Sequence, residues 1–315
     1  MSVSNSSNIL PVVSVIVPTY KGTEFLREAI DSILAQTYPA VEAIIINDGS
    51  PDNTAEVLAE YGTKIVAITQ QNAGTAAARN RGLTSVTGQY VAFLDHDDLW
   101  HPEKLEKQMA VFTNRPDAGM VICGRQFFDH YTHQITSQHP AEPELDVHTL
   151  LSMQAIALQS VIIKKSVLDE IGSFDQSVSG ADDWELTIRI AAKYPVLGVP
   201  ECLVDIRGHE GQQSINSDYM YNRIVVVLDR YKDLHPGCEQ CRKARTAAYQ
   251  FLNEMYYQQM LGQAKTAATN RKLGPAIALL LKGLRRHPQA LARVPLRALQ
   301  RTGIVKKVER GAPHA

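Results

Sequence analysis

The chain has 315 residues, of which 44% are hydrophobic, and its formal net charge is −1 at pH 7. These values are typical of a globular protein with a sizeable core, and a near-neutral chain gives no reason to expect nucleic-acid binding. Residues 1–10 are polar and lack the pattern of a secretion signal, and no apolar run approaches the roughly 20 residues that span a bilayer. We therefore expect a cytoplasmic protein with a disordered N-terminus over residues 1–10.

The first third of the chain alternates short β-branched runs with amphipathic stretches, which is typical of βαβ units and a mostly parallel sheet. The expected strands are Val12–Val17, Val41–Ile46, Lys64–Thr69 and Tyr90–Leu94. The expected helices are Glu24–Gln36, Thr54–Tyr61 and Gly74–Ser85. The pattern predicts an α/β, Rossmann-like fold in which helices flank a central sheet.

Beyond Leu94 the pattern is less regular. The expected helices are Glu103–Phe112, Lys165–Ile171 and Trp184–Lys193, and the expected strands are Gly119–Phe127 and Gln159–Ile163. We predict that Asp129–Asp146 is a loop over the site, and that the chain is helical from about Asp218. These expectations give one domain over residues 11–216, with halves of about 11–100 and 101–216, and a helical, basic C-terminal region over 217–315.

The end of the chain is strongly basic. Between Arg271 and Arg310 there are eleven Lys or Arg residues and one acid, Glu309. Within this stretch Leu273–Leu284 mixes apolar residues with Lys282, and cationic amphipathic helices lie on anionic leaflets. One interpretation is peripheral contact with the inner face of the cell membrane, and the other is a solvated charged surface on a packed helical subdomain.

Three carboxylates within four residues, Asp95, Asp97 and Asp98, follow the strand that is expected to end at Leu94. The carboxyl ends of strands are where an open α/β sheet keeps its ligand site. Neighbouring carboxylates repel one another, and a divalent cation such as Mg²⁺ or Mn²⁺, which also binds substrate phosphates, relieves that repulsion. The cluster predicts a metal and phosphate site. The alternative is a solvated turn in which Asp98 caps the helix that opens at Pro102.

Loops after the other expected strands face the same edge of the sheet and should converge on this cluster. The nucleotide-binding candidates in these loops are Pro18, Thr19, Tyr20, Asp48 and Asn72, and His96 within the acidic cluster is a further one. Tyr20 could stack on a nucleobase, and Asp48 could accept a hydrogen bond from a uracil or thymine imide. The alternatives are a turn tyrosine that packs on the next helix and a carboxylate that serves a turn or a helix cap.

Two phosphate-binding patterns are missing from the sequence. No G-x-G-x-x-G follows the first expected strand, and G-x-x-x-x-G-K-[ST] does not occur. A nicotinamide-dependent enzyme and a P-loop NTPase are therefore not expected. A sugar nucleotidyltransferase is disfavoured as well, because no Gly-rich, Arg-containing loop follows that strand.

A second acidic centre, Asp182 and Asp183, stands directly before Trp184 at the start of an expected helix. In the same pocket, one of these carboxylates could deprotonate an acceptor hydroxyl while a metal stabilises a departing diphosphate. A glycoside hydrolase commonly needs a carboxylic acid to protonate its leaving oxygen, so the arrangement favours a transferase. The alternative is that Asp182 caps the helix and Asp183 complements its dipole.

The segment Arg207–Ser214 combines a cation, an imidazole and glycines, and we predict a closing lid there. Arg207 could neutralise a diphosphate, and His209 could bind the metal or a phosphate. The alternative is that each is an ordinary surface residue.

The four cysteines fall into two groups. Cys123 and Cys202 are expected to be small core residues, whereas Cys238 and Cys241 have the C-x-x-C spacing of a metal or redox site, with His235 nearby. A zinc site there lacks an obvious fourth ligand in the sequence, and a redox pair lacks a thioredoxin-like βαβ context.

Several of these motifs together resemble the family 2 glycosyltransferases over about Val12–Ser214. They are Val15–Tyr20, Ile46–Thr54, Asn72-Ala73-Gly74 with Ala78–Gly82, Phe93–Asp98, Asp182–Trp184 and Arg207-x-His209. The resemblance implies the GT-A fold and single-displacement sugar transfer with inversion at the anomeric carbon. Two residues depart from the family pattern, because Asn47 stands where aspartate is common and Asp182 where glutamate is common. Asn47 in place of aspartate leaves open which nucleobase the site prefers.

The resemblance also implies roles for individual residues. Pro18, Tyr20 and Asp48 would hold the nucleoside, and Arg79 would lie near the diphosphate. Asp95 and Asp97 match the D-x-D motif, with Asp97 as the direct ligand of Mn²⁺ or Mg²⁺. Asp183 matches the base, and Asp182 would support it.

We therefore expect a metal-dependent, inverting glycosyltransferase that uses a nucleotide-diphosphate sugar, with UDP as the expected nucleotide. The expected acceptor is a hydroxyl of a saccharide or lipid-linked saccharide in cell-surface polysaccharide or glycolipid assembly. The alternative is a non-catalytic nucleotide-sugar binding protein on the same scaffold.

Overall fold

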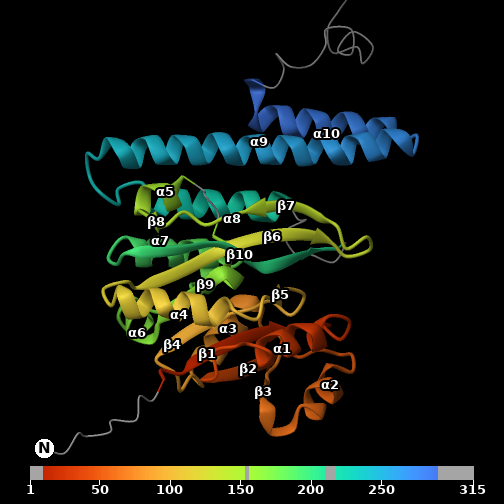
Figure 1. Cartoon of the computed structure of the whole chain (residues 1–315). Coiled ribbons are helices and arrows are strands. Elements are labelled where there is room, and N and C mark those ends of the chain that lie inside the picture. Colours follow the sequence, from red (N-terminus) through yellow and green to blue (C-terminus); the bar gives the residue numbers. More distant parts are fainter. Residues whose placement is uncertain (1–9, 153–155, 210–216, 290–315) are drawn as a thin grey trace, which may run out of the picture. The chain divides into compact units, whose positions relative to one another are not determined.

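The computed structural model describes residues 10–152, 156–209 and 217–289 (Figure 1). The chain divides into two compact units, Met1–Ala244 and Arg245–Ala315, so the boundary falls inside the long helix α9 (Glu239–Thr269). Residues 217–244, which we expected to belong to the C-terminal region, group with the first unit. The expected disordered N-terminus lies outside the described residues except for Leu10.

The first unit is built on one ten-stranded sheet. Its main path has the order β3-β2-β1-β4-β9-β6-β10-β5, with β7 added beside β6 and β8 beside β10. The strands are β1 (Val13–Thr19), β2 (Val41–Asn47), β3 (Val66–Thr69), β4 (Tyr90–Phe93), β5 (Leu99–Trp100), β6 (Met120–Asp129), β7 (Ile135–His139), β8 (Glu144–Leu145), β9 (Val161–Lys164) and β10 (Val196–Gly208).

Strands β1 to β4 pair in parallel, and the expected strands and helices of this half are present. Every side chain of β1 is buried, because helices cover both faces of the sheet and a central strand must then be apolar on both sides. Strands β5, β7, β8 and β9 run antiparallel to their neighbours, so the sheet is mixed. The predicted α/β fold class is confirmed.

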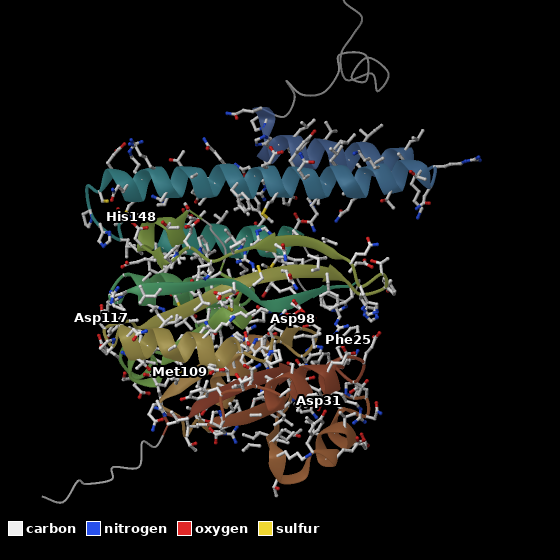
Figure 2. The ribbon with its side chains drawn as sticks, in the orientation of Figure 1. Phe25, Asp31, Asp98, Met109, Asp117 and His148 are labelled. Atoms are coloured by element: carbon white, nitrogen blue, oxygen red, sulfur yellow. The ribbon has the colours of Figure 1, made fainter. Side chains whose placement is uncertain are left out.

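Helices form a layer on each face of this sheet. One core joins β1 to α1 (Leu26–Leu34), α2 (Thr54–Glu60) and α4 (Lys104–Asn114), where Met109 is buried (Figure 2). The other core joins the opposite face to α3 (Thr75–Leu83), α5 (Val147–Leu151), α6 (Lys165–Ile171) and α7 (Asp182–Ala191). The first unit also contains α8 (Ser217–Arg230) and three short 3₁₀ helices at Gly62–Lys64, Leu158–Ser160 and Gln176–Val178.

Two expectations about the second half of the sheet are wrong. The segment Asp129–Asp146 is not simply a loop, because it contains β7, which forms a hairpin with β6, and β8, which pairs with β10. Arg207 does not belong to a flexible lid, because it lies in strand β10 and its side chain is only 2% exposed. Residues 210–214 of the proposed lid lie outside the described residues.

The second unit contains most of α9 and the helix α10 (Leu273–Arg286), where the sequence predicted an amphipathic helix. The basic residues from Arg293 onward lie outside the described residues. Among the helices that the structure describes, none combines the length and the apolar character that a membrane span requires.

Candidate active site

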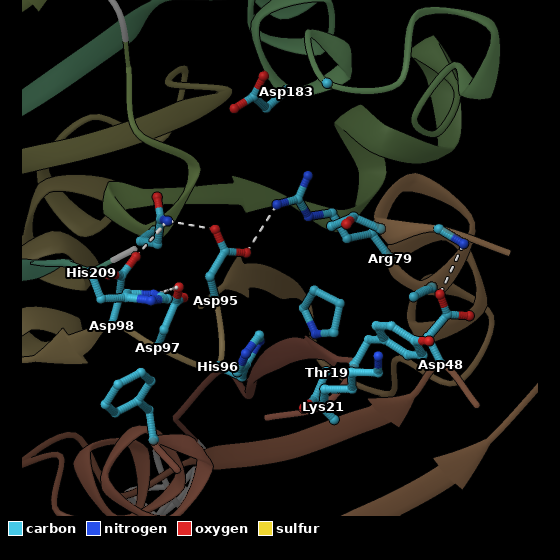
Figure 3. Close-up of a pocket in the computed structure, with 18 of the residues that line it drawn as sticks. Thr19, Lys21, Asp48, Arg79, Asp95, His96, Asp97, Asp98, Asp183 and His209 are labelled. Carbon is cyan, nitrogen blue, oxygen red and sulfur yellow. Dashed lines mark hydrogen bonds and ion pairs between the residues drawn. The ribbon is translucent and has the colours of Figure 1, made fainter. Parts of the chain in front are cut away.

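The ends of several strands in the first unit surround a cavity of about 1050 Å³ (Figure 3). The structure brings nearly all of the predicted site residues together in its wall. They are Pro18, Thr19, Tyr20, Asp48, Asn72, Arg79, Asp95, His96, Asp97, Asp182, Asp183 and His209. Arg207 is the predicted site residue that does not line the cavity. Asp97 and Asp183, which are distant in the sequence, therefore face one common space.

At one end of the cavity, the carboxylate of Asp48 organises the neighbouring loop. It accepts hydrogen bonds from the side-chain amide of Gln70 (2.7 Å) and from the backbone N–H groups of Ala73 (2.9 Å) and Gly74 (2.8 Å). A carboxylate offers about four acceptor positions, so one remains for a ligand. Asp48 is 4% exposed and lines the cavity. It therefore stabilises the loop and also forms part of the cavity wall.

The turn after β2 depends on Gly49. Its φ angle is +71°, a conformation that L side chains rarely adopt, and a Cβ atom there would lie 2.8 Å from the backbone nitrogen of Asn72. Asn47 completes the turn by accepting a hydrogen bond from the backbone of Ser50 at 2.9 Å. Beside this turn, Tyr20 lines the cavity with 43% of its surface exposed. An exposed ring in the wall is available for stacking.

Asp97 and His209 form a close pair, with 2.8 Å between Oδ2 and Nε2 (Figure 3). They come from the loop after β4 and from the residue after β10, and their side chains are 17% and 15% exposed. The ring of Phe25 packs 5.1 Å from that of His209. This oxygen and nitrogen pair fits a divalent cation of the kind that takes one or two protein ligands and completes its shell with substrate phosphates.

Asp95 and Asp98 are held in a different way. The side-chain amide of Gln159 donates to Asp95 Oδ2 (2.6 Å) and to Asp98 Oδ2 (2.7 Å), while the backbone N–H of Arg207 donates to Asp98 Oδ1 (2.9 Å). Burial raises the pKa of Asp98 well above its ordinary value, and the charges of Asp97 and Asp95 add to this effect. Asp98 joins the metal loop to β10; it does not cap a helix in solvent.

Arg207 holds the loop that carries Asp97 and Asp98, from a position outside the cavity wall. Its Nε donates to the backbone carbonyl of Asp97 at 2.9 Å, and Nη2 pairs with Glu28 at 2.8 Å. The guanidinium carbon lies 4.5 Å from the centre of the Phe25 ring and 5.0 Å from that of Phe128. These contacts aim the side chain at the loop backbone and at α1, where it can orient Asp97.

Arg79 bridges the two acidic centres. Its Nη2 lies 3.0 Å from Asp95 Oδ1, and its Nη1 lies 3.3 Å from Asp182 Oδ2. Arg79 is 6% exposed and lines the cavity. One buried guanidinium therefore neutralises a carboxylate of the metal loop and a carboxylate of α7 at the same time.

Asp183 stands in the first turn of α7 and faces the cavity (Figure 3). Burial raises its pKa to about 6, the neighbouring charge of Asp182 adds to the rise, and Arg79 opposes it. Its Oδ1 accepts a hydrogen bond from the backbone N–H of Trp184 at 2.7 Å. A carboxylate with this pKa is ionised at neutral pH and is still basic enough to accept a proton.

Several wall residues were not predicted from the sequence. Gln159 was assigned to a strand, while Tyr219 and Met220 were assigned to the C-terminal helices, yet all three line the cavity. His130 lines it as well and was not named as a site residue, although its segment, Asp129–Asp146, was predicted to lie over the site. No local pattern marks these residues, because they reach the site through strand pairing and helix packing alone.

The charge of the wall gives a test of whether the site suits a metal. It contains seven acidic residues, Glu24, Asp48, Asp95, Asp97, Asp98, Asp182 and Asp183, and two basic ones, Lys21 and Arg79. An anionic ligand would meet a net negative wall, and a divalent cation beside Asp97 and His209 would reduce that repulsion where the ligand binds. The residues present therefore fit a divalent cation.

Comparisons with known proteins agree with this fold. PcManGT, a mannosyltransferase from Pyrobaculum calidifontis solved with GDP-Man and Mn²⁺, superposes with a TM-score of 0.60 at 21% identity, covering 94% of this chain and 80% of its own. TarS 1–349 of S. aureus, solved with UDP, superposes with a TM-score of 0.59 at 17% identity, covering 90% and 91%. The GT-A fold expected from the sequence is confirmed.

Relatives in sequence are more informative about the family. An uncharacterized glycosyltransferase of Rickettsia typhi is 32% identical over 238 residues, which cover 72% of this chain and 71% of the relative. TuaG of Bacillus subtilis, named for teichuronic acid biosynthesis, is 41% identical over 114 residues, or 35% of this chain and 45% of its own. The model of glycosyl transferase family 2 matches residues 14–174. Because that match spans just over half of the chain and the Rickettsia relative aligns over more than two thirds of it, this chain belongs to glycosyl transferase family 2.

Proposed function

We propose that the chain is a metal-dependent, inverting glycosyltransferase that moves a sugar from a nucleoside-diphosphate sugar to an acceptor hydroxyl. The observation that carries the proposal is the shared cavity, which has the Asp97 and His209 pair in one part of its wall and the basic carboxylate of Asp183 in another. Membership of glycosyl transferase family 2 supports the reaction class.

The nucleoside would bind where Tyr20 and Asp48 line the cavity. Tyr20 offers an exposed ring for stacking, and Asp48 keeps acceptor capacity for the imide N–H of a uracil. Thr19, Asn72 and His96 stand beside them in the wall. The donor that we propose is a UDP-sugar; the likeness to TarS, solved with UDP, is consistent with it, whereas PcManGT was solved with a GDP-sugar.

The chemistry that we propose needs one protein base. Asp183 accepts the proton of the acceptor hydroxyl, the acceptor oxygen forms a bond to the anomeric carbon, and the bond from that carbon to the diphosphate breaks. Attack from the side opposite the diphosphate inverts the anomeric centre. Asp97 and His209 would hold the cation, which when bound stabilises the negative charge of the departing diphosphate.

Arg79 would lie near the diphosphate and couple the two halves of the site. It contacts Asp95 on the side of the metal loop and Asp182 on the side of the base. A diphosphate in reach of this guanidinium would receive charge-assisted hydrogen bonds in the planar geometry that suits phosphate. Arg207, which is turned toward the backbone of Asp97, would position the metal loop and leave phosphate binding to Arg79.

The acceptor that we propose is a saccharide or lipid-linked saccharide used in the cell envelope. TuaG, which is named for teichuronic acid biosynthesis, supports a role in polysaccharide assembly. A basic C-terminal stretch could hold the enzyme at the inner face of the membrane, where a lipid-linked acceptor would be found.

The experiment that tests this function begins with donor binding. Unfolding temperatures are measured with UDP-glucose, UDP-galactose, UDP-N-acetylglucosamine and GDP-mannose, each with and without Mn²⁺. We expect one donor class to raise the unfolding temperature, and to do so more strongly with the metal. Release of the nucleoside diphosphate is then followed with saccharide and lipid-linked acceptors. Binding without any release under all of these conditions would favour the non-catalytic alternative.

A single substitution then tests the assignment of the base. Asp183→Asn should reduce turnover by roughly 10²-fold or more, because a positioned general base contributes about 10²–10⁴-fold. Donor affinity and unfolding temperature should not fall, since asparagine can still accept the hydrogen bond from Trp184. The matched control is Asp117→Asn, at an exposed carboxylate paired with Arg115, which should leave turnover unchanged. Normal turnover by the Asp183 variant would refute the assignment.

A further inference from the structure

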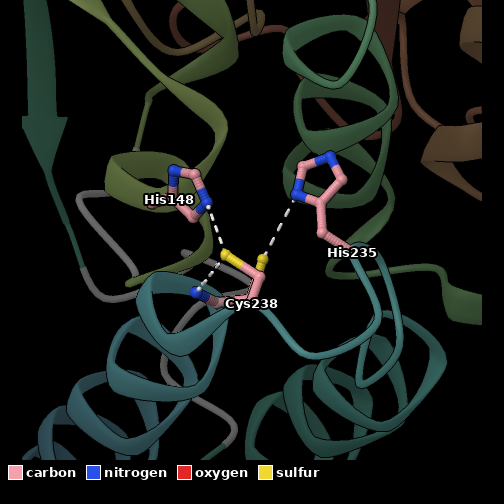
Figure 4. Close-up of side chains that lie close together, drawn as sticks. His148, His235 and Cys238 are labelled. Carbon is pink, nitrogen blue, oxygen red and sulfur yellow. Dashed lines mark hydrogen bonds between the residues drawn. The ribbon is translucent and has the colours of Figure 1, made fainter.

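A cluster of two histidines and two cysteines, residue types that can bind a metal, lies in the first unit outside the cavity (Figure 4). It consists of His148 on α5, His235 in the turn after α8, Cys238 directly before α9, and Cys241 in the first turn of α9. The sequence identified the last three, and the fold adds His148, which is the missing fourth ligand. One potential ligand atom from each residue lies within 4.8 Å of all the others.

Two sulfur–nitrogen distances within the cluster match those of a tetrahedral zinc site. Zinc binds sulfur at about 2.3 Å and nitrogen at 2.0–2.1 Å, which places tetrahedral sulfur and nitrogen ligands about 3.6 Å apart. Here Cys238 Sγ is 3.5 Å from His148 Nε2, and Cys241 Sγ is 3.3 Å from His235 Nδ1. Each sulfur thus faces one imidazole nitrogen at the separation that a shared zinc ion would impose.

The surroundings orient the ligands. Asp146 Oδ2 lies 3.2 Å from His148 Nδ1, which leaves Nε2 of this ring directed at the sulfur (Figure 4). Histidines that bind metals commonly donate their other ring nitrogen to a carboxylate in this manner. The backbone N–H of Cys241 points to Cys238 Sγ at 3.4 Å, and Gly237, with a φ angle of +75°, makes the turn that brings His235 back toward the cysteines.

We propose that His148, His235, Cys238 and Cys241 bind one zinc ion as a closed four-ligand site that ties α5 to the start of α9. Two cysteines and two histidines are a set typical of structural zinc, whereas catalytic zinc keeps one position open. On binding, the two thiols lose their protons to solvent and the metal accepts four electron pairs, with no change of oxidation state. The site is independent of the proposed transfer reaction, because none of its ligands lines the cavity.

Metal content measures this proposal directly. The full chain is purified without added zinc or chelator and analysed by inductively coupled plasma mass spectrometry, and we expect about one zinc per chain. The variants Cys238→Ser and Cys241→Ser should lose it. The matched control is Cys202→Ser, at a half-buried cysteine that contacts the carbonyl of Arg125, and it should retain the zinc. Asp97→Asn should also retain it, which separates this site from the cavity.

Two further measurements keep the proposal testable if the cysteine variants fail to fold. Cobalt(II) exchanged into the wild-type chain should give the sulfur-to-metal charge-transfer bands and intense visible bands of tetrahedral thiolate coordination. Asp146→Asn should weaken zinc binding by about 10–100-fold, since asparagine can still accept the hydrogen bond from Thr149 but carries no charge for His148. Wild-type protein without zinc, or with a Cys238–Cys241 disulfide found by mass spectrometry, would overturn the proposal in favour of a redox pair.

Discussion

Asp183 illustrates how one carboxylate can be costly to bury and useful for that reason. Burial and the adjacent Asp182 disfavour the ionised form and raise its pKa, and the positive charge of Arg79 opposes this rise. The balance leaves the pKa at about 6, higher than the value of an exposed aspartate and below neutral pH. The sequence also allowed Asp182 to cap the helix and Asp183 to complement its dipole. The N-cap of α7 is Ala181, without a side-chain cap, whereas Asp183 stands in the first turn, so a dipole role is compatible with facing the cavity.

The pH dependence of turnover should report this pKa. Below about pH 6 Asp183 is protonated and cannot accept the acceptor proton, so we expect kcat/KM to fall about tenfold per pH unit on the acid side and to level off above it. Asp182→Asn removes a like charge, and the acid limb should then move to lower pH. The measurement is kcat/KM from pH 4.5 to 8 for both proteins. An acid limb at the same pH in the two proteins would contradict the assignment.

Lys104 is a second buried charge, and it has no role in the cavity. Its side chain is fully buried in the first turn of α4, its Nζ lies 3.9 Å from the centre of the Trp100 ring, and no hydrogen-bond partner is found among the described residues. Burial lowers its pKa from 10.5 to about 8. At neutral pH the amine is therefore less favourable in its protonated form in the folded state than in the unfolded state. The contact with Trp100 offsets only part of this free-energy cost.

Lys104→Met should therefore stabilise the protein. At pH 7 we expect the free energy of unfolding to rise by roughly 1–3 kcal/mol. The gain comes from removing a buried charge whose pKa is lowered, and the loss of the contact with Trp100 reduces it. Between about pH 8 and 10.5 the unfolded chain binds more protons than the folded one, so the wild type should gain stability as the pH rises over that range. The difference in unfolding free energy between the variant and the wild type should therefore shrink. Urea unfolding at pH 7 and pH 10 measures both values. The control is Lys107→Met, at a lysine that is 35% exposed and paired with Glu103, which should change stability by no more than about 0.5 kcal/mol.

At the scale of elements, the sequence predicted the parallel half of the sheet well. In the other half it predicted β6, β9 and the helices α4, α6 and α7, but it missed β5, β7, β8 and β10. Strands β1 to β4 are short apolar runs between amphipathic helices, and their periodicity is sufficient to identify them. Strand β10 was missed because its pairing with β6 shifts register between Val199, Cys202 and Val204, which breaks the alternation of side chains. Strand β7, with the sequence ITSQH, is mostly exposed and polar, so nothing in its composition distinguishes it from a loop.

The site could be predicted to a similar extent. The motif residues at strand ends were identifiable because their positions follow from the parallel topology. Gln159, which joins Asp95 to Asp98, and His148, which completes the cysteine cluster, reach their partners through tertiary contacts between distant segments. Such residues carry no local signal. Arg207 was recognised, but its burial in β10 reverses the expectation that it moves with a lid.

Strand β10 supports the metal loop through Arg207, and a substitution should separate this support from catalysis. Arg207→Lys keeps the positive charge but loses the planar group that contacts both Asp97 and Glu28. We expect a loss of about 1–3 kcal/mol in unfolding free energy and a several-fold higher Mn²⁺ concentration for half-maximal activity. Turnover at saturating Mn²⁺ should change much less. A fall in turnover that Mn²⁺ cannot restore would instead indicate contact with the substrate, and Arg115→Lys, at an exposed pair with Asp117, is the control.

At the scale of the whole molecule, charge is distributed very unevenly. The wall of the cavity is rich in carboxylates, whereas the chain from Arg271 to Arg310 is strongly basic. The two features belong to different compact units. This separation allows binding to a lipid surface to be tested apart from catalysis.

We expect the full chain to sediment with vesicles that contain phosphatidylglycerol and to remain in solution with vesicles of phosphatidylcholine alone. High salt should reverse the binding, because the attraction is electrostatic. Replacing Lys282, Arg285 and Arg286 of α10 together by Gln should weaken sedimentation, while donor-dependent unfolding temperatures stay unchanged. Equal sedimentation with both kinds of vesicle would favour the solvated surface that the sequence also allowed.

The position of Arg79 between two carboxylates has a consequence for the order of events. A guanidinium that serves Asp95 and Asp182 at once cannot move toward an arriving diphosphate without loosening its hold on one of them. Any such movement away from α7 would leave Asp183 with less positive charge nearby and make it a stronger base. We therefore expect the two substrates to bind in order. The sugar nucleotide binds first and makes Asp183 more basic, and the acceptor then reacts. An empty enzyme would be correspondingly slow to activate stray alcohols or water.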